Sequence, residues 1–94
     1  MASLELERIQ SAIVDHRYAL TEHAYEEMDE DDLDVLDIES AILTGGIAQV
    51  LTRDPRGTRY VIVGKATDQD TGVGVVVRFV EHDRLLIVTV YEIR

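Results

Sequence analysis

His23 is the residue whose type and position best suit acid–base chemistry. It lies at the start of a predicted helix, next to Glu22 and about one turn before Glu26 and Glu27. An imidazole changes charge near neutral pH and a neighbouring carboxylate can orient it, so His23 is a candidate general base. A capping or packing histidine at a helix start fits the same pattern, and spacing alone leaves both interpretations open.

The same helix has the spacing of metal ligands on one face, with His23 followed by Glu26 and Glu27. No second histidine lies in this helix, and the chain holds no cysteine. We therefore predict no metal site and no cofactor. The absence of cysteine also excludes disulfide bonds.

Arg78 is the second candidate because it interrupts a valine-rich strand, with Val76 and Val80 on its own face. A buried arginine is costly unless it is paired. Arg78 must therefore either emerge at a sheet surface or meet a carboxylate. In the first case its planar guanidinium could hold a phosphate group, and in the second it forms a structural salt bridge to a helix.

Thr89 and Tyr91 lie two residues apart and therefore share one face of the last predicted strand. If Asp83 and Arg84 form the hairpin turn, Arg78 lies opposite Thr89 and all three side chains share that face. Such a patch could hold phosphate or stack on a base. Ordinary strand composition is the alternative interpretation.

Further candidates lie on and beside another predicted strand. Tyr60 is on that strand, and Arg53, Arg56 and Arg59 cluster around the turn before it. These arginines could contact phosphate. They could equally solvate a sheet edge and protect it from aggregation.

Periodicity predicts the elements that must position these side chains. Apolar residues at helical spacing, preceded by capping residues, predict three helices. They run from Ser3 to about Asp15, from His23 to about Asp29 with Thr21 as N-cap, and from the N-cap Asp37 to Gly45 and Gly46. The carboxylates of residues 29–34 repel one another, so this run is predicted to be a loop.

After Gly46 the period changes to two and β-branched residues dominate, which predicts strands. We expect about four, at residues 47–53, 58–66, 73–82 and 85–93, and residues 17–21 form a short strand or extended link. Short turns make neighbouring strands antiparallel, so the fold class is α+β. The last two strands are apolar on both faces. The face away from the helices therefore needs cover from a curled edge, the first helix or a second chain.

Charge is distributed unevenly along the 94 residues. Residues 1–46 hold thirteen carboxylates and two arginines, whereas residues 47–94 hold six acidic and seven basic residues. The resulting field repels nucleic acid and favours basic partners. No apolar segment resembles a signal peptide or a membrane span. We therefore expect one cytoplasmic domain, 1–94, that does not enter a membrane.

Two short motifs carry a resemblance to a known family. The first is Thr21-Glu22-His23-Ala24 followed by Met28 and the helix up to Gly45, and the second is Thr89-Val90-Tyr91 near the end. Together they resemble domain-of-unknown-function family number 4258, whose members begin with a Thr-x-His-Ala helix and end with a Thr-Val-Tyr strand. The resemblance covers about residues 17–93, which makes residues 1–16 an extra N-terminal helix.

That family is similar in layout to the RelE-like and BrnT-like ribonuclease toxins of type II toxin–antitoxin pairs. The resemblance implies a metal-independent, mRNA-cleaving domain in which helices pack on an antiparallel sheet. Carried over by position, His23 would be the catalytic base or acid, Arg78 the phosphate holder and Tyr91 a positioning group. Arg59, Tyr60 and Thr89 would be the substrate-binding residues.

The sequence departs from the family pattern on the acidic side. Glu27 stands where the family usually has arginine, and Glu30, Asp31 and Asp32 replace a basic loop. Because phosphate contacts dominate nucleic-acid affinity, these changes disfavour RNA. Two hypotheses follow: a toxin-like ribonuclease neutralised by a basic antitoxin, or a non-catalytic, acidic protein-interaction module that forms a homodimer through its apolar sheet face.

Overall fold

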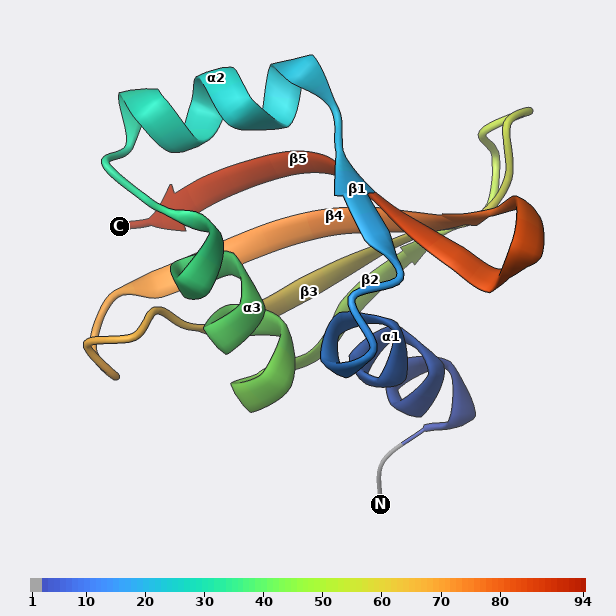
Figure 1. The fold of residues 1–94 in the computed structure, drawn as a ribbon, viewed down its shortest axis with the longest axis horizontal. Helices are drawn as coiled ribbons and strands as arrows, with labels where there is room; N and C mark the ends of the chain where they lie inside the picture. The colour runs from blue at the N-terminus through green and yellow to red at the C-terminus, as the bar shows by residue number, and fades with distance from the viewer. Residues whose placement is uncertain (1–2) are drawn as a thin grey trace.

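Three helices lie on one face of a five-stranded sheet in the computed structural model, which describes residues 3–94. The elements are α1 Leu4–Val14, β1 Tyr18–Leu20, α2 Glu22–Glu30, α3 Val35–Thr44, β2 Gly46–Leu51, β3 Arg59–Lys65, β4 Gly72–Val80, a 3-10 turn Glu81–Asp83 and β5 Arg84–Ile93. Figure 1 shows α1 and α3 in front of the sheet and α2 along its β5 edge. The predicted α+β class is confirmed.

Side-chain caps start the helices. The Ser3 hydroxyl accepts a hydrogen bond from the Leu6 amide, and the Thr21 hydroxyl accepts one from the Ala24 amide, each at 3.0 Å. Both predicted caps are therefore confirmed. These bonds satisfy amides that have no partner within the helix.

The predicted N-cap of α3, Asp37, is wrong. Asp34 is the N-cap, and its carboxylate accepts from the Asp37 amide at 3.0 Å while the Asp37 carboxylate accepts from the Asp34 amide at 3.2 Å. Two aspartates three residues apart can form this reciprocal capping box. The helix consequently begins at Val35, directly after the acidic run 29–34 and two residues before the predicted cap.

The strand order is β1-β5-β4-β3-β2, with every neighbouring pair antiparallel except β1 and β5. The expectation of about four strands falls one short. The fifth strand is β1, which pairs in parallel with Leu85 to Ile87 of β5. Of the two alternatives for residues 17–21, a short strand or an extended link, the short strand is confirmed.

The helices pack on β4 and its neighbours through a continuous apolar core. Val73, Val75 and Val77 of β4 are fully buried against the helices, together with Ile38 and Ile42 of α3. None of the helices among residues 3–94 is long and apolar enough to cross a membrane.

The opposite face of the sheet, here called the outer face, carries no helix among the described residues. Val61 and Val76 lie on it and are 8% exposed, whereas Tyr91 and Ile93 are 36% and 41% exposed. The ring of Tyr91 lies over Gly74, because a Cβ at that glycine would overlap it. Of the three covers considered for this face, the first helix is excluded, since α1 packs on the other side.

Gly64 sets how closely α3 approaches β3. A Cβ built there would overlap the backbone of Ala41, whereas one built at Gly46 meets nothing within 4 Å. Gly64→Ala should therefore lower the free energy of unfolding by roughly 1–3 kcal/mol through overpacking. Gly46→Ala is the matched control and should leave stability unchanged or slightly raised. Urea denaturation of both variants checks this, and equal midpoints would contradict the close approach.

Candidate functional site

Helix α2 takes the place of a strand beside the second half of β5. Strand β1 ends at Leu20, so the β5 backbone beyond Ile87 has no strand on that side. The Thr21 hydroxyl donates to the Val88 carbonyl at 3.1 Å. Further along, the Glu27 carboxylate accepts from the Val90 amide at 3.1 Å and the Asp31 carboxylate accepts from the Glu92 amide at 2.9 Å.

These bonds satisfy a sheet edge that would otherwise be open to pairing with another chain. They also give two acidic residues, Glu27 and Asp31, a structural role. Glu27 and Asp31 are acceptors for β5, so their charges are part of the fold.

His23 lies next to this edge and is joined to it through Glu27. The imidazole Nε2 is 3.2 Å from Glu27 Oε1, the same oxygen that accepts from Val90. The His23 side chain is 64% exposed, whereas Glu27 is 22% exposed. β5 therefore holds the carboxylate, the carboxylate orients the imidazole, and the imidazole stays open to solvent. This arrangement suits a general base.

Among residues 3–94, no three His, Cys, Asp or Glu side chains lie close enough together to hold a metal ion.

The predicted pairing of Arg78 with Thr89 is wrong. Arg78 lies opposite Leu86, Thr89 opposite Val76 and Tyr91 opposite Gly74. Two local features shift the register. The chain turns through the 3-10 segment Glu81–Asp83 rather than at residues 83–84, and the register shifts again between Val76 and Val77.

Arg78, Thr89 and Tyr91 nevertheless share the outer face. Their positions alternate with Val75 and Val77, which face the helices. The shared face that we predicted therefore holds, although Tyr91 lies further along the sheet from Arg78 than the expected register placed it.

Arg78 emerges at the surface instead of meeting a helix carboxylate. Its Nη1 donates to the Arg56 carbonyl at 3.3 Å, and no carboxylate among residues 3–94 lies within ion-pair distance of it. Of the two roles considered for Arg78, the structural salt bridge is therefore excluded.

Tyr60 and Arg59 are placed differently from Arg78. Tyr60 pairs with Val77 and packs against the core on the helix face, so it is separated from the outer-face residues. Arg59 begins β3, and its guanidinium lies 3.1 Å from the carboxylate of Asp54 in the preceding loop. Tyr60 is consequently excluded from any surface that Arg78 and Tyr91 share.

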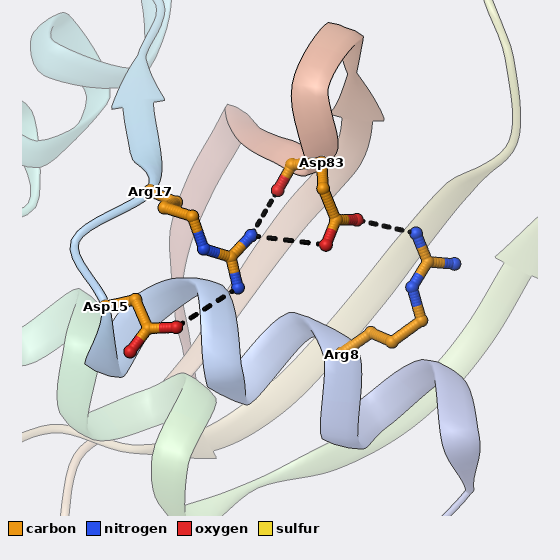
Figure 2. Close-up of polar contacts among 4 residues, drawn as sticks. All are labelled: Arg8, Asp15, Arg17 and Asp83. Atoms are coloured by element: carbon orange, nitrogen blue, oxygen red, sulfur yellow. Dashed lines mark hydrogen bonds and ion pairs between the residues drawn. The ribbon is translucent and has the colours of Figure 1, made fainter.

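A cluster that sequence reasoning missed fixes the β4–β5 loop to α1 (Figure 2). The Asp83 carboxylate accepts from Arg8 Nη2 at 2.9 Å and lies 3.4 Å from Arg17 Nη1, which also donates to the Asp83 carbonyl. Arg17 lies 3.3 Å from Asp15 as well. The only signal in the sequence is that Arg8 and Arg17 are the sole arginines or lysines of residues 1–46.

The cluster holds a loop with an unusual backbone. His82 and Asp83 have φ angles of 62° and 57°, in the left-handed region that non-glycine residues seldom adopt. The hydrogen bond from Arg8, with the charges of Arg8 and Arg17, lowers the pKa of Asp83 below its ordinary value of 3.8. Asp83 is thus kept as the anion that the two arginines need.

Replacing Glu27 should loosen the β5 edge. Glu27→Ala leaves the Val90 amide without its acceptor, which should cost roughly 1–3 kcal/mol of unfolding free energy. Glu26→Ala removes an exposed carboxylate of the same helix and should change stability by less than about 0.5 kcal/mol. Hydrogen exchange at the Val90 amide should accelerate only in Glu27→Ala, and unchanged exchange there would show that the carboxylate does not hold the strand.

The ion pairs of Asp83 should make the free energy of unfolding depend on pH in the acidic range. A carboxyl whose pKa is lowered by folding stabilises the protein above its unfolded pKa, and that stability is lost as pH falls through the folded value. The stability difference between the wild type and Asp83→Asn should therefore be largest near neutral pH and shrink below about pH 4. Denaturation at several pH values measures it, and a difference independent of pH would contradict the ion pairs.

No curated protein and no solved structure matches the chain. The family model described as "Domain of unknown function (DUF4258)" matches residues 20–92. This stretch contains His23, Glu27, Arg78, Thr89 and Tyr91, whereas α1 with Arg8 lies before it. The chain therefore belongs to the DUF4258 family.

Proposed function

We propose that the protein is a metal-independent RNA-cleaving domain that acts as the toxin of a toxin–antitoxin pair. The observation that supports this most strongly is the exposed His23 imidazole, oriented by a carboxylate that the β5 backbone holds in place. A histidine fixed in this way can take a proton from a substrate hydroxyl at neutral pH.

The reaction that such a group supports needs no metal. His23 removes the proton of an RNA 2′-hydroxyl, and the 2′-oxygen attacks the adjacent phosphorus. The bond from phosphorus to the 5′-oxygen breaks, and that oxygen leaves with a proton from the protonated imidazole or from water. The products are a 2′,3′-cyclic phosphate end and a 5′-hydroxyl end.

The outer face supplies the surface on which RNA would lie. Arg78 is on β4, Thr89 and Tyr91 are on β5, and His23 is on the helix along the far edge of β5. An RNA strand that crosses β5 from Arg78 toward α2 would therefore meet the Arg78 cation first. It would then meet the hydroxyl of Thr89 and the ring of Tyr91, and finally the candidate base His23. Arginine would bind phosphate, and Tyr91 would position a nucleotide by stacking.

The positions of the carboxylates on α2 and α3 agree with this proposal, although the chain is acidic. Glu27 and Asp31 accept hydrogen bonds from β5, so they are partly compensated by the backbone. The remaining carboxylates of α2 and α3 suit a basic antitoxin, because complementary charge speeds association and selects partners.

One observation favours a second candidate, the non-catalytic interaction module. Val63, Tyr91 and Ile93 of the outer face are 36%, 36% and 41% exposed, and no helix among residues 3–94 covers this face. A homodimer formed through this face would bury them. Sedimentation equilibrium separates the two candidates, because such a dimer would hide Arg78 and Tyr91 from RNA.

Expression in cells and cleavage by the purified protein test the proposed function. Growth arrest and mRNA cleavage in the presence of EDTA are expected for the wild type. His23→Ala should lower the cleavage rate by about 10²–10⁴-fold, the usual contribution of a general base. His16→Ala is the matched control, because His16 is also exposed and lies 3.8 Å from Glu39. Full growth and intact mRNA with the wild type would rule the ribonuclease out.

A further inference from the structure

We infer that the end of the sheet where the β2–β3 and β4–β5 loops meet is the subsite that holds the RNA backbone, with Arg84 and Arg53 binding phosphate beside Arg78. This inference rests on the proposed function, since it assigns part of the substrate to a surface away from His23. Figure 1 shows the two loops at the same end of the sheet.

Two neighbouring hollows form this surface, here called the arginine end. One has a volume of about 680 Å³ and is lined by Arg56, Arg78 and Arg84 together with His82. The other has a volume of about 530 Å³ and is lined by Arg53, Arg56 and Arg59. Arg56 lines both hollows, so they adjoin, and the bond from Arg78 to the Arg56 carbonyl ties the two loops together.

The arginine end is positive in a chain whose net charge is −10. Five arginines line the two hollows against two carboxylates, Asp54 and Glu81. Asp54 is already engaged, because it lies 3.2 Å from Arg56 and 3.1 Å from Arg59, and its side chain is 4% exposed. Positive charge is therefore in excess at this end.

Three of these arginines have no carboxylate within ion-pair distance among residues 3–94, namely Arg53, Arg78 and Arg84. Since the chain has far more carboxylates than cations, three unpaired arginines at one end need a reason. Anionic groups on a ligand would supply the missing partners, and guanidinium forks match phosphate oxygens in a bidentate geometry.

The loops that carry these arginines are held in place before any ligand arrives. Asp83, next to Arg84, is fixed by Arg8 and Arg17, and Arg84 pairs with Val80 at the end of the sheet. The Asp54 carboxylate also accepts from the Arg56 amide at 2.9 Å, which fixes the other loop. A preorganised site loses less conformational freedom on binding.

RNA fits this surface better than an acidic peptide does. Arg78 belongs both to the arginine end and to the outer face that carries Thr89 and Tyr91. A ligand that continues from the hollows onto that face must therefore offer repeated anionic groups and flat rings for stacking. Single-stranded RNA has both.

Binding of a short single-stranded RNA tests the inference separately from cleavage. The RNA carries 2′-O-methyl groups, so that it cannot be cut, and fluorescence anisotropy is measured in EDTA. Arg84→Ala and Arg53→Ala should each weaken binding about tenfold, as expected for the loss of one charge-assisted contact. Each variant should also release about one ion fewer on binding RNA, which is read from the slope of log affinity against log salt concentration. Unfolding midpoints must match the wild type.

Arg94→Ala is the matched control, because Arg94 is exposed and lies beside Asp31 and Glu92, away from the arginine end. Its RNA affinity should stay within about twofold of the wild type apart from the general effect of one charge. Equal losses in Arg84→Ala and Arg94→Ala would overturn the inference. Tight binding of a glutamate peptide of equal charge, lost in Arg84→Ala, would overturn it as well and assign the site to an acidic peptide.

The outcome also separates this inference from the proposed function. If the wild type does not cut RNA but Arg84→Ala loses RNA binding, the subsite stands and the ribonuclease proposal fails. If the wild type cuts RNA and Arg84→Ala binds and cuts equally well, the subsite alone fails. His23→Ala should bind the methylated RNA as the wild type does.

Discussion

The hydrogen bonds that α2 makes along β5 are the constraint on which the rest of the structure depends. A short β1 leaves the second half of β5 without a strand partner, and side chains of Thr21, Glu27 and Asp31 take over that role. An unpaired strand at this position would be a template for aggregation. The helix therefore has to lie along the edge, and this position places His23 beside the sheet.

Glu27 links the fold to the candidate chemistry. One of its oxygens accepts from the Val90 amide and contacts the His23 imidazole. An arginine at this position could not accept from a strand amide. A carboxylate at position 27 thus has a physical role in this fold, and it gives His23 a fixed acidic neighbour.

Residues 1–46 contain only two arginines, Arg8 and Arg17, and both contact the β4–β5 loop. Arg8 and Arg17 both bind Asp83, so the carboxylate next to Arg84 in the chain is already paired. The helix that carries Arg8 lies outside the residues that match the family. α1 therefore braces the β4–β5 loop, and Arg78 and Arg84 beside it have no carboxylate within ion-pair distance among residues 3–94.

Local signals predicted much of this fold, and long-range geometry did not follow from them. The caps Ser3 and Thr21, the three helices and the strands from residue 46 onward are encoded by nearby residues. The register of β4 with β5 depends on a 3-10 turn and a shift near Val76, which alternation alone does not reveal. In the candidate site, His23, Arg78, Thr89 and Tyr91 could be named from the sequence. The bond from Val90 to Glu27 joins residues 63 apart, so only the folded chain reveals it.

A double-mutant cycle of His23 and Glu27 tests the central claim that Glu27 acts through His23. Glu27→Gln keeps an oxygen that can accept from Val90 and removes the charge that orients the imidazole. RNA cleavage is measured for the wild type, both single variants and the double variant. The account predicts that Glu27→Gln slows cleavage in the wild-type background and has no effect on the residual cleavage of His23→Ala. Equal slowing in both backgrounds would contradict it.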